Sequence, residues 1–260
     1  MPVLVGAEIR RVDEREFADV AYAVMGQVFE IHREFGRFFN ERIYKQELAR
    51  RLPGVLLEAP VEVSFESFRT TYLIDVLVGG CAVFEFKTVE RLTARHRAQV
   101  LNYLLLCELD HAKLVNLRPT AVEHEFVNTT LKLADRTRFQ TIATNWTELS
   151  ECSVRDWFTT LLADIGTGLD LALYEDALTQ RLGGRQLVEQ PVEIISGEQA
   201  IGWQRFRLVQ PDIAFKLTTL SQDLQSFETH ARRMLAHTRL KAIQWINIDH
   251  DEIRFQTLTN

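Results

Sequence analysis

Two short apolar runs constrain the fold of this chain most. Leu73 to Val78 and Ala82 to Phe86 are rich in β-branched and aromatic residues, and Gly79-Gly80 lies between them. Two such runs around a glycine pair predict a β-hairpin.

The length of the hairpin loop decides whether ionisable side chains meet. Side chains alternate across a strand, so Glu85 and Lys87 share one face while Phe84 points into the core, together with Phe86. A strict two-residue loop would pair Asp75 with Phe84 and put Asp75 and Glu85 on opposite faces. We therefore predict a three-residue loop or a bulge here, which brings Asp75 onto the face of Glu85.

On a shared face, these residues suit phosphodiester hydrolysis. Asp75 and Glu85 are hard oxygen ligands for Mg²⁺ or Mn²⁺. The metal would lower the pKa of a bound water and offset charge on the scissile phosphate. Lys87 would orient that water or stabilise the transition state. The alternative is structural: Asp75 ends a strand, and Glu85 and Lys87 line a solvated face.

Six motifs in a fixed order extend this pattern along the chain. Together they resemble the GxxExxY family, a bacterial and archaeal branch of the PD-(D/E)XK nuclease superfamily, over roughly Phe17 to Pro119. The motifs are His32-Arg33-Glu34-Phe35-Gly36, Phe38-Phe39-Asn40-Glu41-Arg42-Ile43-Tyr44, Asp75, Glu85-Phe86-Lys87, His96 to Tyr103, and Leu114-Val115-Asn116.

The resemblance implies a restriction-endonuclease-like αβββαβ core and a catalytic site. It implies that Asp75, Glu85 and Lys87 form the catalytic core, and that Glu41, from the first helical layer, completes or braces the metal site. Two positions depart from the family pattern. Phe38 stands for its first glycine and Ile74 for its proline. Neither side chain takes part in the chemistry.

Contacts to nucleic acid are expected just after the metal strand. Gln99 and Tyr103 match a Q-x(3)-Y element that the resemblance places near the metal on the nucleic acid, and at i and i+4 they share a helical face. Arg91 and Arg95 are candidates to grip phosphates. The net charge of −6 argues against a broadly basic binding surface. A solvated helix with a packed tyrosine is the alternative.

The second half of the chain echoes the first, which predicts a duplicated domain. Leu171 stands where Glu41 would repeat, and Asp212, preceded by Pro211, is expected to correspond to Asp75. No Glu-x-Lys follows Asp212, so this copy is expected to be degenerate, with a shortened metal hairpin. Chance similarity is the alternative. The echoed stretches are Gly36…Tyr44…Leu48…Arg51-Leu52 with Gly166…Tyr174…Leu178…Arg181-Leu182, Pro60 to Val63 with Pro191 to Ile194, and Leu114 to Asn116 with Trp245 to Asn247.

The pattern predicts a mixed α/β protein with two domains, residues 1–145 with the site and residues 146–260 without it. Helices are expected over 14–34, 40–51, 93–107, 153–165, 171–182 and 222–237. Strands are expected over 61–68, 72–78, 82–87, 112–117, 121–127, 187–196, 203–209, 240–248 and 251–258, with one more near 139–143.

Composition excludes several classes of protein. No apolar run approaches the roughly 18 residues that span a bilayer, and no secretory signal opens the chain. Cys81, Cys107 and Cys152 are an odd number without a CxxC pair, which favours a reducing cytoplasm. No phosphate-binding loop, H-E-x-x-H or G-x-S-x-G motif occurs, so no nucleotide cofactor is expected.

The sequence thus predicts a metal-dependent nuclease acting on DNA, and less readily on RNA. The alternative is a nuclease-like module that binds nucleic acid or protein in a defence or repair complex and no longer cuts. DNA is the expected partner, and a protein partner or a homodimer is left open.

Overall fold

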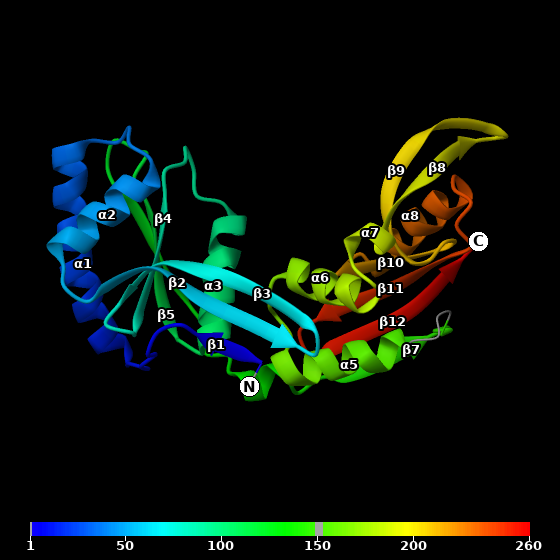
Figure 1. The fold of residues 1–260 in the computed structure, drawn as a ribbon, viewed down its shortest axis with the longest axis horizontal. Coiled ribbons are helices and arrows are strands. Elements are labelled where there is room, and N and C mark those ends of the chain that lie inside the picture. The colour runs from blue at the N-terminus through cyan, green and yellow to red at the C-terminus, as the bar shows by residue number, and fades with distance from the viewer. Residues whose placement is uncertain (1, 149–152) are drawn as a thin grey trace. The chain divides into compact units, whose positions relative to one another are not determined.

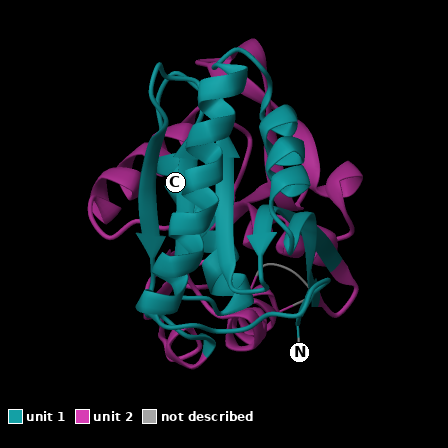
Figure 2. Cartoon of the chain, turned by 90° about the vertical axis from the view of Figure 1, so that its left-hand side faces the viewer, with its two compact units in different colours: residues 1–64, 69–133 teal, residues 65–68, 134–260 magenta. Residues whose placement is uncertain are grey.

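The computed structural model describes residues 2–148 and 153–260 and divides into two compact units (Figure 2). The first comprises Met1–Ser64 and Arg69–Leu133, and the second comprises Phe65–Phe68 and Ala134–Asn260. The first unit ends before the expected boundary at residue 145 because the strand β7 (Gln140–Thr144) pairs within the second sheet. Cys152 lies outside the described residues. No helix in the described ranges is long and apolar enough to cross a membrane.

The first unit is a six-stranded mixed sheet with helices on both faces (Figure 1). The strands follow the order β1-β2-β3-β4-β5-β6, with β4 and β5 parallel. Helices α1 and α2 pack on one face and α3 on the other. The elements are β1 (Val3–Val5), α1 (Glu14–Phe35), α2 (Glu41–Arg51), β2 (Val55–Phe65), β3 (Phe68–Val78), β4 (Ala82–Lys87), α3 (Ala94–Cys107), β5 (His111–Asn116) and β6 (Glu123–Asn128).

Helix α1 follows the signals in its sequence. The Asp13 side chain accepts a hydrogen bond of 2.8 Å from the Glu16 N–H, which caps the start of the helix. Gly36, with φ of 71°, ends it. The apolar stripe of α1 packs against the phenylalanines of β4 and forms the core of this unit. This packing fixes which face of β4 turns away from α1.

Two predictions for the first unit need correction. The strand expected over 61–68 has other bounds, because β2 begins at Val55 and ends at Phe65. The chain turns at Glu66, which has φ of 51°, and this turn joins β2 to β3. Strand β1, which pairs with β2 through Val3↔Val63, was not predicted. Only three residues long, β1 gives too short a pattern to recognise.

The second unit has a similar succession of elements around a second mixed sheet, of order β7-β12-β11-β10-β9-β8, with α4 and α7 in addition and with β7 beside β12. The mixed α/β class predicted from the sequence is therefore confirmed. The elements are α4 (Leu133–Arg136), which begins at the unit boundary, β7, α5 (Val154–Ile165), α6 (Leu171–Arg181), α7 (Arg185–Val188), β8 (Glu189–Ser196), β9 (Gln199–Gln210), β10 (Ile213–Thr218), α8 (Leu224–Ala236), β11 (Ala242–Asp249) and β12 (Glu252–Thr259).

A buried tyrosine closes the loop before the second helix in the same way in both units. The Tyr44 hydroxyl donates to the Gly36 carbonyl at 2.7 Å. The Tyr174 hydroxyl donates to the Gly166 carbonyl at 2.7 Å. The two tyrosines stand at matching places of α2 and α6, as the sequence echo predicts.

A buried asparagine also repeats. The Asn116 amide donates to the Val89 carbonyl at 2.8 Å, and its oxygen accepts from the Val89 N–H at 3.1 Å. Asn247 makes the same pair of contacts to Leu220, at 2.8 Å each. Each asparagine thereby ties the segment after one strand to the neighbouring strand.

The register of the second sheet corrects the expected counterpart of Asp75. Asp212 lies in the turn before β10, a strand that was not predicted, and its carboxylate pairs with Lys241. Lys87 pairs with Asn116 and Thr218 pairs with Asn247 in the parallel ladders. The expectation of a shortened hairpin is wrong, because β9 and β10 form a hairpin whose strands meet at the Ile213↔Gln210 pair.

Counting back two residues from Thr218 places Lys216 where the first unit has Glu85. The β9–β10 ladder pairs Ala214 with Leu208, so Phe206 follows opposite Lys216. Phe206, and not Asp212, is thus the counterpart of Asp75. The Pro211-Asp212 dipeptide matches the family's Pro-Asp motif, and this match led to the incorrect alignment of Asp212 with Asp75.

Candidate functional site

The hairpin loop of the first unit has three residues, as predicted. Val78 pairs with Ala82 and Val76 pairs with Phe84, so Gly79, Gly80 and Cys81 form the loop. The same register sets Asp75 opposite Glu85, on one face of the sheet. The prediction of the loop length is confirmed.

The β3–β4 ladder ends next to Asp75, whose carboxylate replaces a backbone acceptor. Past the Val76↔Phe84 pair, the Phe86 N–H donates to Asp75 Oδ2 at 3.1 Å. A side-chain oxygen thus satisfies a backbone donor at this point. This bond holds Asp75 against β4, the strand that contains Glu85.

Glu85 is a fully buried carboxylate beside one lysine. Its side chain is 0% exposed, and Lys87 Nζ pairs with Oε1. Oε2 is buried with no hydrogen-bond partner. Burial first, and then the charge of Asp75, raise the pKa of Glu85 to about 8. Burial therefore favours the protonated carboxyl, and a cation bound at Oε2 would stabilise the charged form instead.

Lys45 is a member of this site that the sequence analysis missed. Its Nζ lies 2.8 Å from Asp75 Oδ1 and 3.3 Å from Glu41 Oε1, and it also pairs with Glu58. Burial lowers the pKa of Lys45, but the hydrogen bonds to Asp75 and Glu58 outweigh it, so the pKa is raised. The available signal was its position one helical turn after Glu41 and next to the buried Tyr44.

Glu41 reaches the site from the first residue of α2 and is partly buried. Burial first, and then the charge of Asp75, raise its pKa, while Lys87 and Lys45 lower it. Its carboxylate therefore lies in the field of three charged groups of the site, Asp75, Lys87 and Lys45. The structure brings Glu41, Asp75, Glu85 and Lys87 together, as expected.

Helix α3 places the predicted Gln-Tyr pair beside the carboxylates. Tyr103 is 4% exposed, and Gln99 Nε2 donates to its hydroxyl at 3.0 Å. Burial first, and then the charge of Glu85, raise the pKa of Tyr103. Gln99 itself is exposed. Of this pair, only Gln99 is open to a ligand without rearrangement.

The two arginines predicted to bind phosphate lie near the N-terminus of α3 and are exposed. Arg91, in the loop after β4, and Arg95, in the first turn of α3, are exposed, and neither forms an ion pair with another described residue. Arg97, by contrast, is bound to Glu125 through two hydrogen bonds, of 2.6 and 3.0 Å. Arg91 and Arg95 therefore remain available for phosphates.

The residues fit a hard divalent cation in chemistry. Asp75 and Glu85 offer carboxylate oxygens from adjacent strands, and Glu85 Oε2 has no partner of its own. Within residues 2–148 and 153–260, no group of three His, Cys, Asp or Glu side chains is arranged to hold an ion. Lys45 and Lys87 instead pair with these carboxylates.

A comparison with protein families gives one match, which lies within the first unit. Residues 18–128 match the model of the PD-(D/E)XK nuclease superfamily. This nuclease-like domain includes Glu41, Asp75, Glu85 and Lys87, as well as Gln99 and Tyr103. The match indicates nuclease activity in general, and nucleases of this superfamily typically use divalent metals.

Other comparisons add little to the match. No curated protein matches the chain. A solved structure titled "Crystal structure of SSO0001" is similar at 20% sequence identity with a TM-score of 0.30. The similarity covers 46% of this chain and spans 62% of that one.

Proposed function

We propose that the first unit is a metal-dependent nuclease that hydrolyses phosphodiester bonds of DNA, with RNA a poorer substrate. The observation that supports this most is the buried Asp75–Glu85 pair with an unpartnered Glu85 oxygen beside Lys87. Order, spacing and burial of these residues also agree with the GxxExxY branch, to which we assign the domain.

Each side chain has a role in this proposal. Asp75 and Glu85 would hold Mg²⁺ or Mn²⁺, with Glu41 bracing the site. When bound, the ion supplies an activated water and offsets phosphate charge. Lys87 positions the attacking water and stabilises developing charge on phosphorus.

The substrate contacts come from the edge of the same site. Gln99, held by Tyr103, contacts the strand next to the scissile phosphate. The exposed Arg91 and Arg95 bind neighbouring phosphates. We propose DNA as the partner, while a cytoplasmic location and a homodimer or protein partner stay predictions.

We further propose that the second unit is a copy of the first that has lost its chemistry. The shared tyrosine and asparagine contacts support this. At the four catalytic positions, leucine, phenylalanine, lysine and threonine replace glutamate, aspartate, glutamate and lysine: Leu171, Phe206, Lys216 and Thr218.

One observation favours a second candidate function, a binding module that does not cut. Lys45 pairs with both Asp75 and Glu41, and Lys87 pairs with Glu85, so the carboxylates already have cationic partners. In that case the site would be a structural ion-pair cluster.

Cleavage and metal binding together separate the two functions. Labelled single- and double-stranded DNA and RNA are incubated with Mg²⁺, Mn²⁺ or EDTA, and Mn²⁺ binding is measured by calorimetry. We expect DNA cleavage that EDTA stops and that Lys87→Ala abolishes, while Lys241→Ala, an exposed lysine of the second unit, cuts normally. Mn²⁺ binding that Glu85→Gln leaves unchanged, or equal cleavage by Lys87→Ala, would refute the nuclease assignment.

A further inference from the structure

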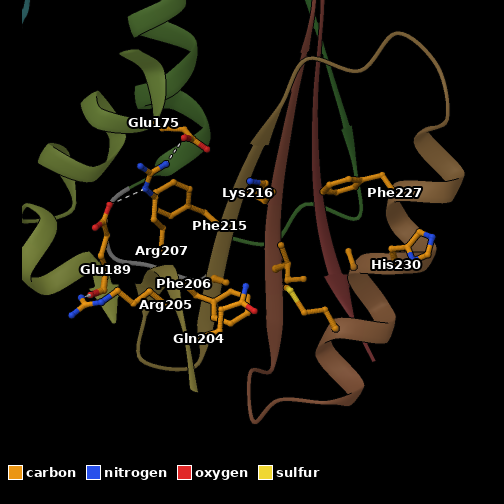
Figure 3. A pocket seen from close by; sticks show the side chains of 14 residues that line it. Glu175, Glu189, Gln204, Arg205, Phe206, Arg207, Phe215, Lys216, Phe227 and His230 are labelled. Carbon is orange, nitrogen blue, oxygen red and sulfur yellow. Dashed lines mark hydrogen bonds and ion pairs between the residues drawn. The ribbon is translucent and has the colours of Figure 1, made fainter. Parts of the chain in front are cut away.

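The second unit contains a cavity of about 550 Å³ where β9 separates from β10 (Figure 3). The β9–β10 ladder ends at the Ala214↔Leu208 pair, and the cavity is lined mainly by the strand segments beyond it and by α8, with single residues from α6, β8 and β11. Phe206 and Lys216, the counterparts of Asp75 and Glu85, both line it. A cavity of this size accommodates a small organic ligand.

One wall of the cavity is apolar and aromatic. Phe206 from β9 and Phe227 and Met234 from α8 pack on the core of this unit, and all three line the cavity. Phe227 lies against the buried Trp245 with ring centroids 4.5 Å apart. The first unit has an aspartate in place of Phe206, so the second has replaced a charge by a stacking surface.

The other walls supply positive charge. Arg207 pairs with both acidic side chains of the lining, Glu175 and Glu189, as the dashed lines in Figure 3 mark. Lys216 is exposed and forms no ion pair with any described residue. Arg205 is also exposed and, among the residues that the structure describes, donates only to the Glu189 carbonyl, at 3.1 Å. Arg207 offsets one of these two carboxylate charges, and with Lys216 and Arg205 the lining has three cations against two carboxylates, a net charge of +1.

The exposed His230 of α8 adds a hydrogen-bonding group to the cavity wall. Together the walls present aromatic side chains and cations in one cavity. The charge at the position of Glu85 has been reversed, so a place that suits a cation in the first unit suits an anion in the second.

We propose that this cavity binds a nucleoside monophosphate group, with the phosphate on Lys216 and the base against Phe206 and Phe227. Lysine binds phosphate as a point charge, and bases stack on aromatic side chains. The choice of a nucleotide over other aromatic anions rests on the proposed nuclease function of the first unit. The group comes from a free nucleotide or from the end of a nucleic-acid strand.

The test measures binding apart from cleavage. The full chain with Lys87→Ala is titrated in EDTA with deoxyadenosine 5′-monophosphate, with a 5′-phosphorylated single-stranded oligonucleotide, and with inorganic phosphate. Calorimetry gives affinity, and tryptophan fluorescence reports on Trp245 behind Phe227. Because this form lacks metal and Lys87, failure of the nuclease assignment leaves the measurement unaffected.

Lys216→Glu is expected to weaken binding about tenfold or more, because it turns attraction of phosphate into repulsion. Phe206→Ala should weaken nucleotide binding and leave phosphate binding unchanged. The matched control Lys241→Glu, on an exposed lysine outside the cavity, should stay within about twofold of the parent.

The outcomes separate the sources of the ligand. Oligonucleotide binding that Lys216→Glu weakens, without mononucleotide binding, assigns the cavity to a strand end, because the DNA contacts of the first unit do not depend on Lys216. Mononucleotide binding alone assigns the cavity to free nucleotide. Inorganic phosphate that binds as tightly as either nucleotide ligand overturns the proposal. So does nucleotide binding that Lys216→Glu and Phe206→Ala leave unchanged.

Discussion

Replacing Glu85 with Gln should change how the stability of the first unit depends on pH. Glutamine keeps the shape of the side chain and removes its charge. In the metal-free protein the folded state holds the Glu85 pKa at about 8, above its ordinary value of 4.5, so folding favours the protonated carboxyl. The stability contribution of this group is therefore complete below pH 4.5 and is lost as pH rises through 8.

The size of the effect follows from linkage. One pKa unit corresponds to about 1.4 kcal/mol, so raising the pKa of Glu85 from 4.5 to about 8 gives an upper limit near 5 kcal/mol. Water entry and side-chain relaxation reduce this, and we expect about 2 kcal/mol or more. Between pH 5 and pH 9 the unfolding free energy of the wild type should fall by that much relative to Glu85→Gln.

The distribution of tryptophan makes the assay specific to the unit. All four tryptophans, at 146, 157, 203 and 245, belong to the second unit, so their fluorescence follows only its unfolding. Circular dichroism follows both units. A urea transition seen by circular dichroism and absent from tryptophan fluorescence belongs to the first unit.

Measurements in EDTA at pH 5, 7 and 9 then compare the two proteins. Equal pH dependence in wild type and Glu85→Gln would contradict a raised pKa at this position. Adding Mn²⁺ at pH 9 should restore stability to the wild type and not to the variant, because only the carboxylate binds the ion.

Three further changes test other parts of the structure. Lys45→Met should destabilise the first unit by about 3 kcal/mol, because it leaves Asp75 buried without its cation; an unchanged urea midpoint by circular dichroism would argue against this. Arg91→Ala and Arg95→Ala should each reduce the salt dependence of DNA binding by about one phosphate contact, measured by anisotropy between 50 and 200 mM salt. Tyr174→Phe should cost about 1 kcal/mol in the transition followed by tryptophan fluorescence, because a buried hydrogen bond is lost.

Much of the site was predictable because alternation along a strand is a local rule. The spacing of Asp75 and Glu85 required a three-residue loop, and the register of β3 and β4 has one. Lys45 was not predictable in the same way. Its partners come from β2, β3 and the start of its own helix, and no spacing in the sequence shows that these three places meet.

The second unit shows how a local motif can mislead. Pro211-Asp212 matched the expected dipeptide, and because of this match the strand β10, which follows it, was not predicted. The reliable signals were the tyrosine and asparagine that bind backbone groups, because their partners repeat with them. Contacts to the main chain depend on topology, which the two units share in these segments.

The turn between β3 and β4 has a consequence for insertions and deletions. Gly79 and Gly80 have φ of 58° and 68°, and a Cβ on Gly80 would lie 2.3 Å from the Glu8 carbonyl oxygen. Deletion of one residue from this turn would shift the register of β4 and exchange its two faces. Glu85 would then point toward α1 and the phenylalanines would point away from it. Among natural variants of this chain, the length of this turn should therefore be held more strictly than the identity of Cys81 within it.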